Sequence, residues 1–529
     1  MTNLAWKLRR ASDESGDSVA IFDVDGSQYT YDELKATSNR IGNFLQEEWG
    51  VEEDDIVAAL LPSSFWTVAF MFGAMKAGAA FSPENYTLEH RTLVGNLDNT
   101  SSVGLVYDES VYADAPYLAA QADSVRNSAT VDEFRDAVAG HSDEFSIVPR
   151  KGDDLAGINY TSGTTGAPKA VQITHGTAAA TIAADKDPIR GISNGDLALL
   201  ATPMYHIAGI TAPMISASEA VSLVVMNGWD VDTFVEHVRE FDLDLFFWMA
   251  PTWVRDTLNH DAWGELDLSG LDIYLAGGPG QPYMYEELRE AGARASCIYG
   301  MTETMGDAVA HASIAQDEDL EMNIGSVGTP ARELGEVKLI TLDDGSEITD
   351  PDVEGEICWR GDNLTPGYLN DPERTAEAID EDGWFHTDDL GYFDEDGYLY
   401  ISGRADDMII SGGEKLSLAE LDDALLQHEA VEDAGTVGVA HERFGEVPAA
   451  FVVPTDESMT EAELRDLLDE YMLETLARWK RPRLYAIIDE IPRTHSKQSK
   501  IAADLEPHVE DIVLGVDSSV TTLSAVRNE

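Results

Sequence analysis

A run of small polar residues just before Ala170 is the stretch of this sequence best suited to chemistry. Its glycines let backbone N–H groups approach an anion closely, its hydroxyls can donate further hydrogen bonds, and its lysine supplies a positive charge. This combination indicates a polyphosphate-binding loop and a nucleotide substrate; the alternative is a plain polar turn. Ala170 follows the lysine, so the run is not a Walker A motif. The candidate residues are Thr161, Ser162, Gly163, Thr164, Thr165, Gly166 and Lys169.

The elements around this loop predict how it is positioned. Apolar stretches at 156–160 and 170–174 predict two strands, which makes the loop the tip of a hairpin. Upstream, residues 19–150 alternate short apolar runs with helical patterns, which is typical of a parallel α/β layer. We expect strands at 19–22, 56–61 and 103–107 and helices at 31–48 and 65–77, with a polar stretch at 119–154 leading into the hairpin.

Residues 198–304 predict a second α/β layer, in which two apolar strands end at polar segments. The strand at 271–275 is followed by Gly277 and Gly278, and the strand at 293–298 is followed by Tyr299. Ligands of open α/β sheets bind beyond the carboxyl ends of the strands. Both polar segments therefore lie where a binding site would form.

From Gly325 the sequence changes to short alternating strands and turns, which predict a small β-rich subdomain. Past a boundary near residue 403, helices and strands predict a compact α+β unit of normal domain size, including a helix opened by the capping box Thr460 to Glu463. The expected fold class is an α/β large domain, with two α/β layers plus the β-rich subdomain, joined to a smaller, mobile α+β C-terminal domain. The expected ranges are 1–403, 404–510 and a tail at 511–529.

The composition is strongly acidic: 99 Asp and Glu against 34 Lys and Arg give a formal net charge of -65 over 529 residues. Such a surface repels nucleic acid and anionic lipid, and we favour a protein adapted to high salt, where screening removes most self-repulsion. The two cysteines, Cys297 and Cys358, give no disulfide framework and fit a reducing cytoplasm. Neither a signal peptide nor a membrane span is predicted. A homodimer is an open alternative for the assembly.

Six motifs follow one another along the chain: the loop at 160–169, Pro203 to Gly209, Gly277 to Pro279, Tyr299 to Thr304, Trp384 to Asp389, and Gly403 to Asp407. In this order they resemble the motifs of the adenylate-forming enzymes, which include acyl-CoA synthetases, nonribosomal adenylation domains and luciferases. The resemblance spans roughly residues 15 to 505. It implies that a carboxylate attacks the α-phosphate of ATP to give an acyl-adenylate and pyrophosphate, and that the thiol of CoA then displaces AMP.

The resemblance also implies a role for each matching residue, with ATP, Mg2+ and CoA as the cofactor and cosubstrates. Hydroxyls of the loop and Lys169 would hold the β- and γ-phosphates, Thr302 would touch the α-phosphate, and Glu303 would ligate Mg2+. The small domain would rotate about a hinge at Asp406 between the two steps. Tyr299 and the Gly278 backbone would frame adenine, with Gly300 also at the nucleotide site. Asp389 would accept hydrogen bonds from the ribose hydroxyls, and Arg404 would reach the ribose or phosphate. The acid and thiol site would be flanked by His206, Gly277, Gly412 and Gly413.

The chain departs from the family pattern at the catalytic lysine, which the family places on the small domain. An ungapped reading puts Gln498 at that position, whereas an insertion puts Lys500 there; we favour Lys500 over Lys497. Asp388 also replaces a glycine beside Asp389, which adds negative charge near the nucleotide.

The leading hypothesis is an ATP-dependent, AMP-forming acid-CoA ligase that acts on a fatty or aryl acid. One alternative is a nucleotide- or acyl-binding protein with impaired adenylation, motivated by Gln498 and Asp388. Another is an adenylase that loads a carrier-protein thiol. The sequence does not choose the acid.

Overall fold

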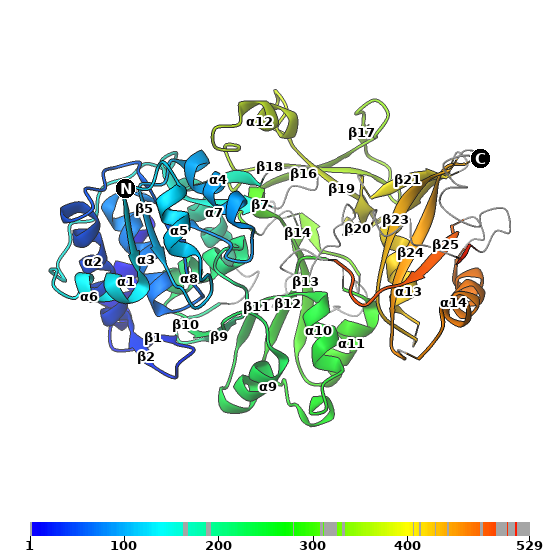
Figure 1. Ribbon diagram of the computed structural model, residues 1–529, viewed down its shortest axis with the longest axis horizontal. Helices are drawn as coiled ribbons and strands as arrows, with labels where there is room; N and C mark the ends of the chain where they lie inside the picture. Colours follow the sequence, from blue (N-terminus) through cyan, green and yellow to red (C-terminus); the bar gives the residue numbers. More distant parts are fainter. Residues whose placement is uncertain are drawn as a thin grey trace. The chain divides into compact units, whose positions relative to one another are not determined.

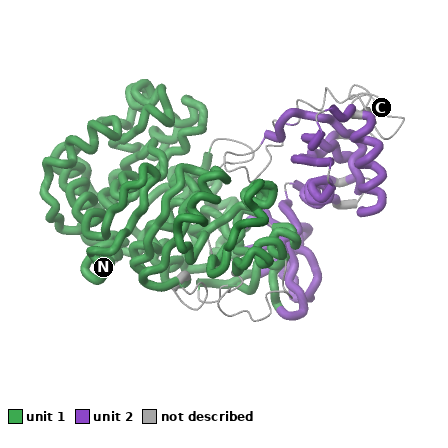
Figure 2. The backbone as a smooth tube through the Cα atoms, turned by 90° about the horizontal axis from the view of Figure 1, so that it is seen from below, with its two compact units in different colours: residues 1–337, 359–386, 397–399 green, residues 338–358, 387–396, 400–529 purple. Residues whose placement is uncertain are grey.

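The computed structural model places the chain in two compact units (Figure 2). Unit 1 comprises residues 1–337, 359–386 and 397–399, and unit 2 comprises residues 338–358, 387–396 and 400–529. The domain boundaries expected after residues 403 and 510 stay predictions. The residues described by the structure are 3–161, 168–186, 192–278, 280–306, 310–311, 325–330, 334–405, 407–411, 414–428, 430–441, 444–456, 458–476, 480–492, 505 and 514–515.

The first α/β sheet of unit 1 carries the predicted hairpin at one edge. Its strand order is β6-β5-β3-β4-β7-β8, and its neighbours are parallel except for the antiparallel pair β7 and β8. Both faces of the inner strands are buried, as expected from their continuous apolar runs. The strands are β3 (Ile56–Leu60), β4 (Ala80–Pro83), β5 (Gly104–Tyr107), β6 (Asn127–Thr130), β7 (Leu155–Thr161) and β8 (Lys169–Thr174).

The polar stretch at 119–154 holds more structure than we expected from its sequence. It contains β6 and the helix α6 (Val131–Val138). The Thr130 side chain accepts a hydrogen bond from the Glu133 amide, and the Glu133 side chain accepts one from the Thr130 amide, so a capping box opens this helix. The Thr-x-x-Glu spacing was the signal for this helix, and its few apolar residues concealed it.

The second sheet of unit 1 includes the strand at 19–22, which we had expected in the first layer. The sheet order is β15-β14-β13-β12-β11-β9-β10-β1-β2. Its strands from β9 to β13 are labelled in the lower half of Figure 1. Strand β1 pairs in parallel with β10, with Ile21 opposite Leu223. Local pattern predicts a strand but not its neighbour, because both layers offer apolar surface. The strands are β1 (Val19–Phe22), β2 (Gln28–Thr30), β9 (Leu197–Leu200), β10 (Ser222–Val225), β11 (Leu245–Met249), β12 (Asp272–Leu275), β13 (Arg294–Tyr299), β14 (Ala310–His311) and β15 (Thr329–Pro330).

Helices cover these sheets and pack on them in more than one apolar cluster. One cluster includes buried residues of both sheets, and a separate cluster covers the opposite face of the inner strands of the first sheet. Helix α3 is buried along almost its whole length, which explains why its sequence is apolar all round. No helix within the described part of the chain is long and apolar enough to cross a membrane. The helices of unit 1 are α1 (Ala5–Ser15), α2 (Tyr31–Glu47), α3 (Phe65–Ala77), α4 (His90–Thr100), α5 (Ala115–Gln121), α6, α7 (His175–Lys186), α8 (Ile207–Glu219), α9 (Val231–Glu240), α10 (Pro251–Leu258), α11 (Pro282–Glu290) and α12 (Pro372–Ala378), with 3-10 turns η1 (Trp263–Glu265) and η2 (Thr302–Thr304).

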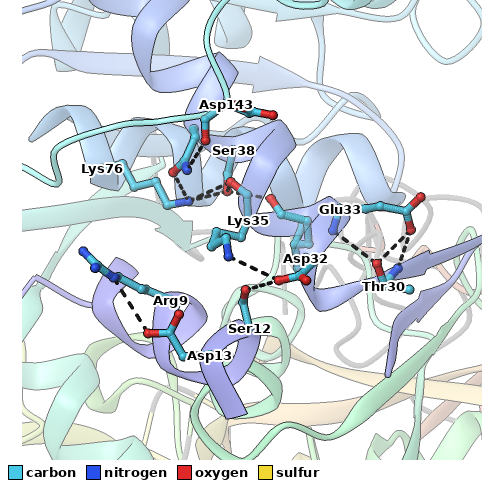
Figure 3. A network of polar contacts seen from close by, with 12 residues as sticks. Arg9, Ser12, Asp13, Thr30, Asp32, Glu33, Lys35, Ser38, Lys76 and Asp143 are labelled. Atoms are coloured by element: carbon cyan, nitrogen blue, oxygen red, sulfur yellow. Dashed lines mark hydrogen bonds and ion pairs between the residues drawn. The ribbon is translucent and has the colours of Figure 1, made fainter. Parts of the chain in front are cut away.

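A fully buried lysine lies where α2 packs on α3 (Figure 3). The Lys76 ammonium donates to the backbone carbonyl of Lys35 at 3.1 Å, to the Ser38 hydroxyl at 2.7 Å and to the Asn39 side-chain oxygen at 2.7 Å. These acceptors carry no charge. Burial is the main reason that the pKa of Lys76 lies well below its ordinary value.

The rest of the chain forms the predicted β-rich subdomain and the C-terminal α+β unit. The subdomain sheet has the order β17-β16-β18-β19-β20, and the C-terminal sheet has the order β22-β21-β24-β25-β26, with β23 pairing β24. The capping box expected at Thr460 opens α14. The elements are β16 (Gly335–Ile340), β17 (Glu347–Ile348), β18 (Gly355–Gly361), β19 (Phe385–Phe393), β20 (Leu399–Arg404), β21 (Met408–Ser411), β22 (Glu414–Ser417), β23 (Val431–His441), β24 (Gly445–Pro454), β25 (Leu484–Ile487), β26 (Leu514–Gly515), α13 (Leu418–Leu426) and α14 (Glu461–Thr475).

Candidate active site

The predicted phosphate-binding loop connects β7 to β8, as expected for a hairpin tip. Thr161 lies opposite Lys169 at the end of the antiparallel pair. These two residues therefore mark the base of the tip. Ser162, Gly163, Thr164, Thr165 and Gly166 lie outside the described residues, so their predicted contacts with phosphate stay predictions.

The structure brings together Lys169 and Glu303, which lie far apart in the sequence. The Lys169 ammonium lies over the ring of Tyr368, 4.9 Å from its centroid. The hydroxyl of the same tyrosine donates to Oε1 of Glu303 at 2.9 Å. Tyr368 is 5% exposed and Glu303 is 7% exposed. A cation and an anion are thus held on one buried aromatic side chain.

Glu303 occupies a short 3-10 turn that follows β13 after Gly300 and Met301. Its backbone carbonyl accepts a hydrogen bond from the Thr365 amide at 2.8 Å. The carbonyl of the neighbouring Thr304 accepts one from the Asn363 side chain at 2.9 Å. The segment around residue 365 therefore fixes the turn that carries Thr302 and Glu303.

The carboxyl ends of parallel strands gather the other predicted site segments of unit 1. Neighbouring strands β11, β12 and β13 are parallel, so the residues after them lie at one sheet edge. Gly277 and Gly278 follow β12, and Tyr299 and Gly300 mark the end of β13. Gly277 has a φ of 82°, a conformation that favours glycine. Their predicted contacts with adenine stay predictions.

His206 follows β9 and precedes α8. Its amide donates to the Pro203 carbonyl at 2.9 Å, and its ring lies 4.7 Å from that of Tyr205. The Tyr205 carbonyl in turn accepts from the Asn159 side chain of β7 at 2.8 Å. The segment that carries His206 is therefore anchored to the strand that leads into the phosphate-binding loop.

Asp389 and Arg404 form an ion pair within unit 2. The guanidinium Nη1 donates to Oδ1 of Asp389 at 2.9 Å, and Asp389 is 8% exposed. Asp388, the residue that replaces a glycine, has a φ of 59°. Asp is among the residues that tolerate this left-handed backbone region. The substitution therefore keeps the backbone conformation for which the glycine is suited.

Several predicted residues lie outside the described part of the chain. Their roles stay predictions. They are the alternative adenylation lysines Lys497 and Lys500, the neighbouring Gln498, the hinge Asp406, and Gly412 and Gly413.

A buried carboxyl lies beside the hairpin and could not be recognised from the sequence. Glu84 is 1% exposed; its oxygens accept from the Ser82 hydroxyl at 3.0 Å and from the Asn96 amide at 3.2 Å. The Asn96 carbonyl also accepts from the Tyr160 hydroxyl at 2.9 Å. Burial raises the pKa of Glu84 to about 7. One acid among many gives no sequence signal; only its burial distinguishes it.

Tyr368 was missed for a different reason. No spacing in the sequence relates it to Lys169 or Glu303, and a single aromatic residue after Gly367 reads as ordinary core. Its significance depends on two contacts made across the fold.

Comparison with known protein families shows to which family the chain belongs. The AMP-binding enzyme family matches residues 8–369, and the AMP-binding enzyme C-terminal domain matches residues 420–498. The chain belongs to the AMP-binding enzyme family. The expected adenylate-forming fold is confirmed, as is an enzyme of the acid-CoA ligase type.

Individual relatives and solved structures are similar to this chain over almost its whole length. The chain is 31% identical to a 2-succinylbenzoate–CoA ligase of Bacillus cereus, over 93% of this chain and 96% of that protein. It is similar to the o-succinylbenzoate CoA synthetase of Bacillus subtilis in complex with an acyl-adenylate intermediate, with a TM-score of 0.82 and 28% identity over 94% of this chain and 97% of that one. ATP-bound MatB from Rhodopseudomonas palustris gives a TM-score of 0.85 and 25% identity over 96% and 99%.

Proposed function

We propose that the protein is an ATP-dependent, AMP-forming ligase that activates an aryl carboxylic acid and transfers the acyl group to CoA. A carboxylate oxygen of the acid would attack the α-phosphorus of ATP, with cleavage of the bond to the bridging oxygen and departure of pyrophosphate. The CoA thiolate would then attack the acyl carbonyl and release AMP. The observation that carries this proposal is the shared placement of Lys169 and Glu303 beside the phosphate-binding hairpin.

The charges of the site fit this chemistry. Nucleotidyl transfer depends on positioning and on neutralising phosphate charge. Lys169 would hold an outer phosphate, together with Thr161 and the loop hydroxyls. Glu303 accepts a hydrogen bond from a neutral tyrosine, a contact that leaves the carboxylate charge intact. Its oxygens therefore suit Mg2+, a hard cation that prefers oxygen ligands and that would neutralise phosphate charge when bound.

The other site residues take the following roles in the proposal. Thr302 would contact the α-phosphate, since it precedes Glu303 on the same turn. The Asp389 carboxylate, oriented by Arg404, would accept hydrogen bonds from the ribose hydroxyls. The unit 2 segment past residue 404 would act as the mobile domain and deliver Lys500. Tyr299, Gly300 and Gly278 would frame adenine, and His206, Gly277, Gly412 and Gly413 would border the acid and thiol.

The similarity to succinylbenzoate ligases supports an aryl acid over a fatty acid. Several such ligases are 31–32% identical to this chain over 85–93% of its length. The substrate for which they are named, 2-succinylbenzoate, is an aromatic acid with a second carboxylate, and it is therefore included in the first substrate panel.

A panel of acids tests this function. Purified protein in molar KCl would be incubated with ATP, Mg2+, CoA and 2-succinylbenzoate, benzoate, anthranilate, malonate or medium-chain fatty acids, and acyl-CoA would be detected by mass spectrometry. We expect an aryl-CoA product and stoichiometric AMP. A product only from fatty acids would refute the aryl assignment, and AMP formation without any acyl-CoA would favour transfer to a carrier-protein thiol.

A further inference from the structure

Tyr368 makes a different contact with each of two charged residues near the phosphate-binding hairpin. Its ring face lies under the Lys169 ammonium at 4.9 Å, and its hydroxyl donates to Glu303 Oε1 at 2.9 Å. The side chain is 5% exposed, so few water molecules compete for either contact. This one side chain contacts Lys169, almost two hundred residues away in the sequence, and Glu303, more than sixty residues away.

The backbone around Tyr368 is fixed to the hairpin itself. Tyr368 pairs with Val171 in an antiparallel bridge, and the amide of the next residue donates to the Ala170 carbonyl at 2.8 Å. The Tyr368 amide donates to the Thr375 hydroxyl at 3.0 Å. The position of the ring is therefore determined by the strand that begins at Lys169.

Each contact orients a charge without neutralising it. A cation over an aromatic face is attracted by the ring quadrupole, while its N–H groups stay able to donate to phosphate oxygens. A phenol that donates to a carboxylate takes one of about four acceptor positions and adds no opposing charge. A direct pair of lysine and glutamate would instead cancel both charges.

We propose that Tyr368 is a positioning residue for nucleotide binding: its ring sets the Lys169 ammonium for a phosphate of ATP, and its hydroxyl sets the Glu303 carboxylate for the accompanying divalent cation. The inference rests on the proposed roles of Lys169 and Glu303. It adds a residue that contacts neither phosphate nor cation and acts through those that do.

The two halves of the side chain can be separated by substitution. Tyr368→Phe removes the hydroxyl and keeps the ring, whereas Tyr368→Leu removes both. Tyr31→Phe is a matched control within unit 1, because the buried Tyr31 hydroxyl donates to the Val221 carbonyl at 2.6 Å, away from either charged residue.

The experiment measures binding and not turnover. The dissociation constant of ATP would be determined by titration calorimetry in EDTA and over a series of Mg2+ concentrations, with no acid and no CoA present. Failure to form acyl-CoA would then count against the proposed function, while the binding data test Tyr368 separately. Melting temperatures of all variants would verify that they fold.

We expect Tyr368→Phe to raise the Mg2+ concentration for half-maximal enhancement of ATP binding about tenfold, the effect of losing a charge-assisted hydrogen bond. Its ATP affinity in EDTA should stay within about twofold of wild type. Tyr368→Leu should in addition weaken ATP binding in EDTA about threefold through loss of the ring. Tyr31→Phe should change neither property.

Two results would overturn the proposal. One is Tyr368→Phe with an unchanged Mg2+ dependence. The other is Tyr368→Phe with ATP binding weakened equally in EDTA and in Mg2+, which would indicate a general structural role. If Tyr368→Leu fails to fold, the Phe variant alone still decides between these outcomes.

Discussion

The buried carboxyl of Glu84 gives the sharpest prediction about stability. Its oxygens accept hydrogen bonds from the neutral groups of Ser82 and Asn96, and burial raises its pKa from 4.5 to about 7. The pKa of Tyr160 also lies well above its ordinary value, mainly through burial and secondly through the charge of Glu84. Glu84→Gln keeps the size and polarity of the side chain, because the amide can donate to the Ser82 hydroxyl and accept from Asn96.

The sign and size of the effect follow from proton linkage. Between about pH 4.5 and pH 7 the folded chain holds a proton on Glu84 that the unfolded chain has released, so wild-type stability falls as pH rises through this range. At about 1.4 kcal/mol for each pH unit between the two pKa values, the loss amounts to about 3 kcal/mol above neutrality. The Gln variant has no titrating carboxyl at this position, so its stability does not decrease for this reason.

Urea unfolding of wild type and Glu84→Gln would be followed by tryptophan fluorescence at several pH values from about 4.5 to 8.5. We expect the variant to gain about 3 kcal/mol relative to wild type across that range. The exposed residue Glu48 provides the control, because Glu48→Gln makes the same substitution at the surface. A difference between Glu84→Gln and wild type that does not change with pH would refute the reasoning.

Three further predictions concern ionisation and salt. Burial holds the pKa of Lys76 well below 10.5, so the unfolded chain binds more protons than the folded chain at alkaline pH. Wild type should therefore gain stability relative to Lys76→Met as the pH rises from about 7 to 10. Denaturant titrations in which the free energies of unfolding of the two proteins change equally with pH would contradict this. Burial lowers the pKa of His175 to about 4, so wild type should lose about 3 kcal/mol relative to His175→Asn as pH falls from 6.5 to 4, measured in the same way; equal slopes would exclude it. With a net charge of -65, lowering KCl from about 2 M to 0.1 M should reduce the melting temperature, and a melting temperature that is independent of salt would argue against adaptation to high salt.

Much of the fold could be predicted because local patterns decide local structure. Helix α3 was expected at 65–77 and is found there, and strands β7 and β8 flank the loop as expected. The pairing of β1 with β10 could not be predicted, since a short apolar run fits either sheet. Helix α6 was not predicted because it has few apolar residues and therefore a weak helical pattern; the capping box at its start was the main signal in the sequence.

Some residues of the candidate site could be predicted from the sequence and others could not. Lys169 and Glu303 could be proposed from motifs whose residue types carry chemistry. Tyr368 and Glu84 could not, because their importance comes from burial and from contacts between distant segments. The amino-acid sequence specifies which chemical groups are present. The surroundings that orient a charge or raise a pKa form only when the chain folds.

The central claim is that the protein forms an acyl-adenylate. Exchange of labelled pyrophosphate into ATP, measured with Mg2+ and an aryl acid in the absence of CoA, tests this step directly. We predict exchange that depends on the acid, with a rate strongly reduced in Lys169→Ala. No acid-dependent exchange with any acid of the panel, despite measurable ATP binding, would contradict the account and identify a nucleotide-binding protein with impaired adenylation.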